Sequence, residues 1–284
     1  MLEEIWLPKP KCTLLSKNKN NTMIQPLAYV HPEAKIAQNV VIEPFVTIAK
    51  NVVIGEGTWI GSNATIMEGA RIGKNCRIFP GAVVSAIPQD LKFKGEETIV
   101  EIGDNTTIRE CVTINRGTVA KGKTVVGSNC LLMCYSHVAH DCALKDNVIL
   151  GAYTALAGEV VVDDFAIVSS GSLVHQFVNI GSHVMIQGAS KVGKDVPPYV
   201  KAGRDPLAYE GVNSIGLRRR NFDNEKINEI QNIYRIIFGR GMNTTQSLEY
   251  IEAELPATKE RDEILLFVRN SKRGIIKGYF EAEP

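Results

Sequence analysis

The sequence is poor in aromatic residues and contains no long apolar segment. Aromatic residues make up only 7% of its 284 positions, whereas small residues are plentiful and include 24 glycines. No stretch approaches the roughly 18 consecutive apolar residues that a membrane-spanning helix needs. This composition favours a thin, repetitive architecture over a bulky globular core, and it predicts no stable insertion into a membrane.

The sequence also lacks an excess of charge of one sign and a disulfide pattern. Its net charge is +1 and 22% of its residues are charged, so no general electrostatic argument favours nucleic-acid binding. The six cysteines contain no CxxC pair and no disulfide-framework spacing, which predicts a reducing, cytoplasmic environment. Residues 1–22 are polar and lack the apolar segment of a secretory signal, so we expect a loosely ordered extension.

A period of six residues runs through most of the sequence. Every sixth residue is aliphatic in three segments, 24–84, 102–114 and 126–192, and the residue four positions later is small or β-branched. A helix would space its apolar residues three and four apart, and a half-buried strand would alternate at two. Six residues fit one flat side of a coil, and three sides close a triangular prism in which residues 18 apart stack. This hexapeptide pattern predicts an all-β left-handed parallel β-helix over residues 23–200.

The aliphatic column stays in phase across two gaps. We therefore expect residues 85–101 and 115–125 to include loops that leave the prism without shifting its register, and long loops on a repetitive scaffold are usually functional. A tolerated insertion remains the alternative for the second gap. After the repeat ends, residues 201–284 predict a small α-helical C-terminal domain that covers the end of the prism. Its helices are expected at 223–240, with Asp223 as N-cap, at 244–255 and at 258–272.

Three of the five histidines fall close together in the stacked frame of the prism. His137 and His140 lie three residues apart, and His175 lies in a later coil. Counting by 18, His140 stacks below Gly158, and Gly158 stacks below Gln176. The periodicity therefore gathers these five residues on one region of the prism. His31 and His183 are interpreted as ordinary corner or surface residues.

The residue types in this cluster suit acid–base chemistry. Imidazole titrates near neutrality, so His140 is a candidate for proton abstraction from a hydroxyl. Asp141 beside it is able to fix its tautomer, and the backbone N–H of Gly158 is able to approach an oxyanion. The alternative is a set of exposed polar residues on a solvated face, which the clustering disfavours.

A zinc site is a second interpretation of the histidines. Another hexapeptide-repeat class, the carbonic anhydrase type, binds zinc with three histidines, and His137, His140 and His175 provide three imidazoles. His137 and His140 flank the inward-pointing Val138 around a corner, however, and a neighbouring aspartate fits acid–base work better. We therefore expect no metal site. The cysteines of the small-residue column are predicted to be structural, namely Cys76, Cys130 and Cys142.

Five motifs resemble one enzyme family within this fold class. The sequence is similar, from residue 23 to about 278, to the acyl-ACP:UDP-N-acetylglucosamine O-acyltransferases, which catalyse the first step of lipid A synthesis. The hexapeptides alone would specify only the superfamily, whereas the loop and histidine motifs are more specific. The motifs are Gln89–Glu96, Ile108–Thr118, His137–Cys142, Val174–Phe177 and Asp195–Val200.

The resemblance implies a mechanism and an assembly. It implies a homotrimer with active sites in clefts between adjacent prisms. His140 would act as general base toward the sugar 3-hydroxyl of UDP-N-acetylglucosamine, with Asp141 supporting it and the Gly158 amide holding the oxyanion. The donor would be a (3R)-3-hydroxyacyl chain on the 4′-phosphopantetheine of acyl carrier protein, and no other cofactor is implied.

The resemblance also assigns binding residues. An arginine run suits acyl carrier protein, which is acidic, although a solvated helix start is the alternative for this run. The three arginines are Arg218, Arg219 and Arg220. The positions that resemble the family's substrate contacts are Asp90, Lys92, His137, His175, Gln176, Asn213 and Arg219.

Two further positions refine the expected specificity. Gly188 resembles the position whose side-chain size limits acyl length in the family, and a glycine there predicts a long 3-hydroxyacyl donor. Glu159 departs from the family's frequent histidine, which leaves its contact to the sugar or the diphosphate open.

Three other functions compete with this assignment. A related N-acyltransferase would normally carry an N-terminal uridine-binding domain, for which 22 residues are too short, whereas a preference for a 3-amino sugar is not encoded in these motifs. A non-catalytic β-helix would predict regular threonine or hydrophobic ladders on a flat face. The third alternative is the zinc enzyme discussed above.

Overall fold

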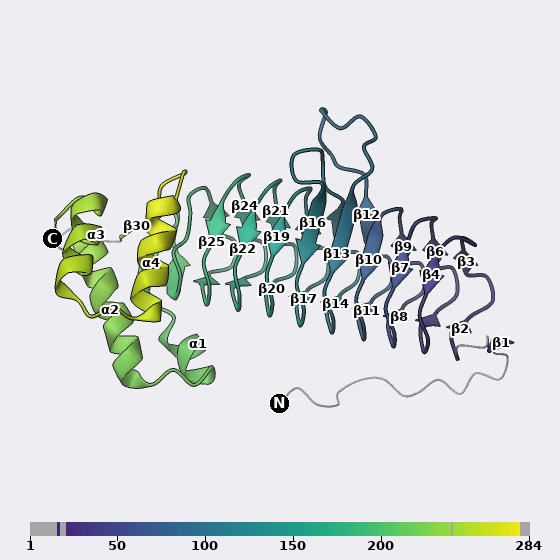
Figure 1. The fold of residues 1–284 in the computed structure, drawn as a ribbon, viewed down its shortest axis with the longest axis horizontal. Helices are drawn as coiled ribbons and strands as arrows, with labels where there is room; N and C mark the ends of the chain where they lie inside the picture. Colours follow the sequence, from purple (N-terminus) through teal and green to yellow (C-terminus); the bar gives the residue numbers. More distant parts are fainter. Residues whose placement is uncertain (1–15, 18–20, 240, 279–284) are drawn as a thin grey trace.

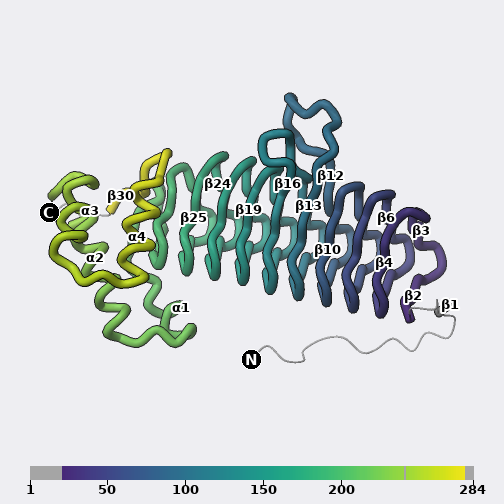
Figure 2. The backbone as a smooth tube through the Cα atoms, viewed as in Figure 1, coloured from purple at the N-terminus to yellow at the C-terminus, as the bar shows by residue number. Residues whose placement is uncertain are grey.

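Three parallel β-sheets form the faces of a long prism with a cluster of helices at one end (Figure 1). The computed structural model describes residues 16–17, 21–239 and 241–278. Most of the predicted 1–22 extension lies outside the described residues. The tube in Figure 2 shows successive coils advancing along one axis, with each coil lying beside the next.

From β2 to β27, each face collects every third strand of the coil, and face A also includes β1 at one end and β28, β29 and β30 at the other. Face A contains β1 (Ser16–Lys17), β2 (Met23–Ile24), β5 (Val41–Ile42), β8 (Trp59–Ile60), β11 (Arg77–Ile78), β14 (Thr107–Ile108), β17 (Leu131–Leu132), β20 (Ile149–Leu150), β23 (Ile167–Val168), β26 (Met185–Ile186), β28 (Val200–Gly203), β29 (Ala208–Val212) and β30 (Lys277–Gly278). Face B contains β3 (Tyr29–Val30), β6 (Thr47–Ile48), β9 (Thr65–Ile66), β12 (Val83–Ala86), β15 (Thr113–Asn115), β18 (His137–Val138), β21 (Ala155–Leu156), β24 (Leu173–Val174) and β27 (Lys191–Val192). Face C contains β4 (Lys35–Ile36), β7 (Val53–Ile54), β10 (Ala70–Ile72), β13 (Ile99–Ile102), β16 (Lys123–Val126), β19 (Ala143–Leu144), β22 (Val161–Val162) and β25 (Asn179–Ile180).

The two loops add whole multiples of six residues, which preserves the register. Ile42 pairs with Ile60 at the regular spacing of 18. Ile78 pairs with Ile108 at a spacing of 30, and Ile108 pairs with Leu132 at a spacing of 24. The additional residues leave the prism between β12 and β13 and between β15 and β16, and both loops project on the same side (Figure 1). The first loop adds twelve residues and the second adds six. Because both numbers are multiples of six, the aliphatic residues after each loop point into the interior again.

The interior consists of the two columns that the period predicts. Ile60 and Ile78 of the aliphatic column are 0% exposed, as are Ala64 and Cys76 of the small-residue column. Aliphatic side chains fill the middle of each short side, and small residues fit where two sides converge. Burial of these side chains from every coil supplies the main stabilising term of the prism.

Corner residues adopt left-handed backbone conformations three positions after most of the aliphatic residues. Asn39, Asn51 and Asn75 have φ values of 58°, 53° and 53°, a region that asparagine tolerates better than most residues. The glycines directly after the aliphatic residues serve a different purpose. A Cβ on Gly55 would lie 2.5 Å from the backbone of Gly73 in the next coil, so these glycines allow close stacking.

Stacked corners form three edges, which we name by their most distinctive residues. Backbone N–H groups of one coil donate to carbonyls of the previous coil along every edge. The aromatic edge includes Leu27, Phe45, Tyr135, Tyr153 and the pair Gly188–Ala189. The histidine edge includes the pairs His140–Asp141, Gly158–Glu159 and Gln176–Phe177. The cap edge includes Phe165, His183 and Tyr199.

The C-terminal part contains the three predicted helices, together with one further helix, α1, and three strands that the sequence did not predict. The helices are α1 (Ser214–Arg219), α2 (Asn224–Gly239), α3 (Thr244–Glu254) and α4 (Lys259–Asn270). The predicted boundary at 200/201 falls inside β28, which pairs with β26 of the last coil and, antiparallel, with β29. These strands and β30 extend face A, so the prism sheet continues into the helical part. Within the described ranges, no helix is long and apolar enough to cross a membrane.

Candidate active site

The histidine edge brings together the residues that stacking by 18 predicts. The Glu159 N–H donates to the His140 carbonyl at 3.0 Å, and the Phe177 N–H donates to the Gly158 carbonyl at 3.2 Å. His140, Gly158 and Gln176 therefore occupy equivalent corner positions of three consecutive coils. The His140 side chain is 12% exposed, so its ring is largely sheltered and still reachable.

Gly158 leaves room for the imidazole of His140. A Cβ built on Gly158 would lie 2.6 Å from both Cε1 and Nε2 of that ring, which no real side chain would tolerate. Among the described residues, no backbone acceptor receives the Gly158 N–H. The ring therefore packs against Gly158, whose N–H has no backbone acceptor in the described part of the chain.

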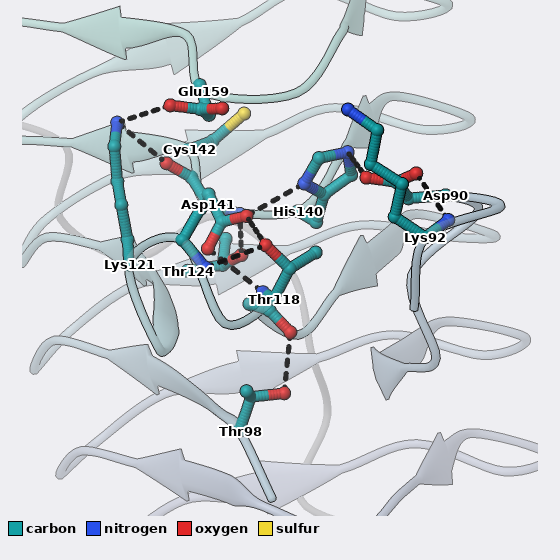
Figure 3. Close-up of polar contacts among 12 residues, drawn as sticks. Asp90, Lys92, Thr98, Thr118, Lys121, Thr124, His140, Asp141, Cys142 and Glu159 are labelled. Carbon is teal, nitrogen blue, oxygen red and sulfur yellow. Dashed lines mark hydrogen bonds and ion pairs between the residues drawn. The ribbon is translucent and has the colours of Figure 1, made fainter. Parts of the chain in front are cut away.

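Asp141 is fully buried and fixes the other side of the imidazole. Its Oδ2 lies 2.8 Å from His140 Nδ1, and Thr118 donates its N–H to Oδ1 at 2.9 Å and its hydroxyl to Oδ2 at 2.6 Å (Figure 3). Burial raises the pKa of Asp141, but the hydrogen bonds from Thr118 and His140 outweigh it and hold that pKa below its usual value. An ionised carboxylate only accepts, so Nδ1 carries the proton and Nε2 keeps its lone pair.

The larger loop, between β12 and β13, brings a carboxylate to the Nε2 side of the ring. Asp90 Oδ2 lies 3.9 Å from His140 Nε2, and the Lys92 N–H donates to Asp90 Oδ1 at 2.9 Å (Figure 3). This separation exceeds a direct hydrogen bond. It leaves space for a third oxygen that contacts Nε2 and Asp90 together.

Glu159 forms an ion pair with a residue of the second loop. Its Oε2 lies 3.8 Å from Lys121 Nζ, and the same ammonium donates to the Asp141 carbonyl at 3.4 Å (Figure 3). The acidic side chain that departs from the family's frequent histidine is thus balanced by a cation of this chain. Lys121 was not identified from the sequence, because its partner is set by the path of an inserted loop.

The remaining polar residues of the cluster surround the corner without converging on one point. His137 lies on face B, where its Nδ1 is 2.7 Å from Thr113 Oγ1 and burial lowers its pKa. His175 is exposed, and its Nδ1 lies 3.0 Å from the Gln176 carbonyl. In the part of the chain that the structure describes, no three His, Cys, Asp or Glu side chains are arranged to hold a metal ion.

Two residues assigned by the resemblance lie elsewhere in this chain. Gly188 is on the aromatic edge, where Ala189 stacks on Ser170. Asn213 caps α1 by accepting from the Gly216 N–H at 3.2 Å, and its amide donates to the His183 carbonyl on the cap edge at 2.9 Å. One chain therefore does not bring either residue to His140.

The arginine run divides into two exposed side chains and one that is partly covered. Arg218 and Arg219 are exposed. The Arg220 guanidinium donates to the carbonyls of Gly216 and Phe165 and lies 5.1 Å from the centre of the Phe165 ring. Arg220 thus attaches α1 to the prism, whereas the Arg218 Nε–H donates to Asn224 Oδ1 at 3.2 Å and its side chain, like that of Arg219, is exposed.

Comparison with known proteins assigns the family. Residues 195–276 match the family model described as "Udp N-acetylglucosamine O-acyltransferase; Domain 2", and residues 123–158 match "Bacterial transferase hexapeptide (six repeats)". A relative from Aliivibrio fischeri (strain MJ11), named acyl-[acyl-carrier-protein]--UDP-N-acetylglucosamine O-acyltransferase, is 44% identical over 69% of this chain and 75% of its own length. The chain belongs to this O-acyltransferase family.

Solved structures of UDP-N-acetylglucosamine acyltransferases agree with this membership. The one from Bacteroides fragilis 9343 is 58% identical, with a TM-score of 0.89 and coverage of 90% of this chain and 100% of the other. The one from Francisella novicida is 42% identical, with a TM-score of 0.87 and coverage of 90% and 94%. The predicted family, the left-handed β-helix with a helical C-terminal part and the acyltransferase class are confirmed.

Proposed function

We propose that this acyltransferase moves a (3R)-3-hydroxyacyl chain from acyl carrier protein to the 3-hydroxyl of UDP-N-acetylglucosamine, the first step of lipid A synthesis. The relatives' names support the substrates. The observation that carries the chemistry is His140, held at Nδ1 by the buried Asp141 and packed against Gly158 through Nε2 and Cε1.

The geometry supports general-base catalysis by His140. Nε2 accepts the proton of the sugar hydroxyl as its oxygen attacks the thioester carbonyl carbon. The resulting oxyanion accepts a hydrogen bond from the Gly158 N–H. The carbon–sulfur bond then breaks, and the leaving thiolate of the 4′-phosphopantetheine takes the proton from the imidazolium. General-base catalysis contributes about 10²–10⁴-fold and one oxyanion donor about 10²–10³-fold.

Asp90 supports orientation of the acceptor. A hydroxyl placed between Asp90 Oδ2 and His140 Nε2, which are 3.9 Å apart, is able to contact both atoms. Four other residues around the histidine edge are assigned the remaining substrate contacts in this proposal. They are Lys92 of the larger loop, His137, His175 and Gln176. The mechanism needs no cofactor beyond the prosthetic group of the donor.

A homotrimer explains the separation of the other assigned residues. Gly188 lies on the aromatic edge and Asn213 against the cap edge, whereas the base lies on the histidine edge. The three edges of a prism face different directions, so a site that unites them requires more than one chain. Exposed apolar side chains on the aromatic edge, such as Tyr135 and Tyr153, support a contact between copies. We assign Arg219 to the substrate and, with Arg218, to acyl carrier protein.

Gly188 supports a long acyl chain. The residue is exposed and has no side chain, and an added Cβ would already lie only 3.2 Å from the Ser170 carbonyl oxygen. We expect transfer from long 3-hydroxyacyl carrier proteins and a shift toward shorter donors in Gly188→Met. A panel of donors tests this, and a wild-type preference for ten carbons would refute it.

The cysteines support a cytoplasmic location. Cys76, Cys130 and Cys142 are buried free thiols. Burial raises the pKa of Cys130 to about 11 and that of Cys142 to about 12, which makes their thiolates scarce and oxidation slow. Unpaired thiols are typical of a reducing compartment.

The decisive experiment is acyl transfer by His140→Ala. We expect the rate to fall at least about 100-fold while the trimer and its thermal stability persist, because the ring lies outside the apolar core. His31→Ala, on a distant coil, serves as the matched histidine control and should retain full activity. Near-normal transfer by His140→Ala would refute the assignment of the base.

A further inference from the structure

The second loop, residues 116–122, contacts the buried carboxylate behind the base. Thr118 uses both of its donors there, with its N–H on Asp141 Oδ1 at 2.9 Å and its hydroxyl on Oδ2 at 2.6 Å. Oδ2 is also the oxygen that lies 2.8 Å from His140 Nδ1. One threonine therefore contacts both oxygens of the carboxylate that orients the imidazole (Figure 3).

The direction of the Thr118 hydroxyl bond is determined by its surroundings. The Ala120 N–H donates to Thr118 Oγ1 at 3.2 Å, so the hydroxyl oxygen already accepts from its own loop. Asp141 is ionised and has no proton to give. The hydroxyl proton must therefore point at Asp141 Oδ2, and a charge-assisted bond of this length is among the stronger ones in proteins.

The loop itself is held firmly on both sides of Thr118. Before it, Thr98 donates its hydroxyl to the Gly117 carbonyl, and the Gly117 N–H donates to the Ile99 carbonyl at 3.2 Å. After it, the Gly122 N–H donates to the Thr118 carbonyl at 2.7 Å. A Cβ on Gly117 would lie 2.3 Å from the Lys123 nitrogen, so the loop follows a path that only glycine allows at this position. Such anchoring is what a group that orients another side chain requires.

We propose that Thr118 is a positioning residue of the transfer reaction. Its hydroxyl holds the Asp141 carboxylate in the place where it fixes the Nδ1–H tautomer of His140, so that Nε2 faces the sugar hydroxyl. The inference rests on the proposed function, since it concerns the same base. It also gives the second loop a function. The sequence alone was compatible with either a functional loop or a tolerated insertion at this place.

Several charged groups lie around Asp141 and its imidazole partner. A protonated His140 contacts the carboxylate and favours its ionisation, and Lys121 donates to the Asp141 backbone carbonyl. Glu159 pairs with Lys121, Asp90 lies on the far side of the imidazole, and the Cys142 thiol is neutral because burial raises its pKa. Without the Thr118 hydroxyl, burial opposes ionisation of Asp141 with less compensation. The pKa of Asp141 should therefore rise, and the rate deficit should grow as the pH falls.

Thr118→Val removes the hydroxyl and keeps the shape, and Thr118→Ser keeps the hydroxyl. We expect kcat of Thr118→Val to fall about 10- to 100-fold, the range of a lost hydrogen bond to a charged group, with KM for UDP-N-acetylglucosamine changed less than about twofold. Thr118→Ser should stay within about threefold of wild type. The kcat deficit of Thr118→Val should be larger at pH 6 than at pH 8.

Thr106→Val is the matched control. Thr106 is buried on another edge, where its hydroxyl donates to the Gly127 carbonyl and accepts from the Cys130 N–H. The Thr106→Val variant should be less stable than wild type, with the same kcat and the same pH dependence of kcat. If Thr118→Val fails to fold, Thr118→Ala replaces it under the same expectation, since it removes the hydroxyl without adding a methyl group.

His140→Ala, measured beside these variants, separates the two claims. Normal kcat across the pH range in Thr118→Val, or equal impairment of the serine and valine variants, would overturn the positioning role while an inactive His140→Ala leaves the base in place. Activity in His140→Ala would overturn the base itself, whatever Thr118 does.

Discussion

His140 and His183 occupy similar corners of the same prism and have opposite surroundings. His140 is held by the charged Asp141 and packs against Gly158. His183 is stacked between the rings of Phe165 and Tyr199, with centroids 5.0 and 5.5 Å away, and its buried Nδ1 has no hydrogen-bond partner among the described residues. The two positions differ by one residue in the repeat, because His183 has the left-handed backbone (φ 57°) that Asp141 has at the histidine edge (φ 60°). Different segments also cover the two edges: inserted loops lie at the histidine edge, and the C-terminal part lies at the cap edge.

The environment of His183 suppresses its protonation. Burial lowers its pKa to about 4, and the positive charges of Arg220 and Lys259 add to this effect. Folding therefore favours the neutral ring at this edge. At the histidine edge, by contrast, the buried charge is a carboxylate with every oxygen in a hydrogen bond. Burial therefore disfavours a charged group at the cap edge, whereas hydrogen bonds stabilise a charged group at the histidine edge.

The largest effect on acyl transfer is expected from adding a side chain at Gly158, which packs against His140 from the next coil. In Gly158→Ala, the new methyl group would lie 2.6 Å from Nε2 and Cε1, so the imidazole must leave its position. We expect acyl transfer to fall at least about 100-fold, comparable to loss of an oxyanion donor. Gly193→Ala is the matched control, because a Cβ there meets nothing within 4 Å. A fully active Gly158→Ala would show that this packing is irrelevant to catalysis.

The next effect concerns stability and pH at the cap edge. The unfolded histidine protonates near pH 6.5 and the folded one near 4, so the wild type should lose stability as the pH falls through this window. His183→Phe keeps the stacked ring and removes the titration. It should gain about 2 kcal/mol relative to wild type between pH 7.5 and pH 5. Urea unfolding at both pH values measures this, and parallel behaviour of the two proteins would contradict the depressed pKa.

A smaller effect should separate two adjacent arginines. Arg219→Ala removes an exposed charge, so we expect unchanged stability and a rise of about fivefold in KM for the acyl carrier protein, reduced at high salt. Arg220→Ala removes the contacts to Phe165 and Gly216 and should destabilise the protein by about 1–3 kcal/mol. Steady-state kinetics and thermal unfolding of both variants test the division. If Arg219→Ala and Arg220→Ala had the same KM and the same stability, the proposed difference between the two arginines would be wrong.

The smallest effect is expected at the Lys121–Glu159 pair. Both side chains are partly exposed, at 40% and 23%, so screening limits their contribution to stability to about 0.5 kcal/mol. Lys121→Met should leave the melting temperature nearly unchanged and lower kcat by no more than about threefold. A tenfold or greater rise in KM for UDP-N-acetylglucosamine would instead show that Lys121 contacts the nucleotide diphosphate directly.

The sequence predicts what the period controls and misses what the inserted segments control. Stacking by 18 predicts His140 below Gly158 and Gln176, because no insertion falls between these coils. Thr118 lies 23 residues before Asp141, outside any regular spacing, since its loop adds six residues to that coil. Its contact depends on the path of the loop, which periodicity does not encode.

The C-terminal part shows the same limit. Helix periodicity identified α2, α3 and α4 closely, including Asp223, which accepts from the Lys226 N–H at the start of α2. The hairpin of β28 and β29 was missed because the six-residue period ends before it. His183, interpreted as an ordinary corner or surface residue, is a corner residue but is largely covered by this part of the chain.

The central claim is that Asp141, held by the second loop, leaves the His140 base with a proton on Nδ1 and a lone pair on Nε2. Nitrogen-15 NMR of histidine-labelled protein at pH 8 measures this directly, with the signals assigned from His140→Gln and His183→Phe. We expect the Nδ1–H tautomer for His140 and, as the pH falls to 5, a His183 ring that remains neutral. An Nε2–H tautomer at His140 would contradict the claim.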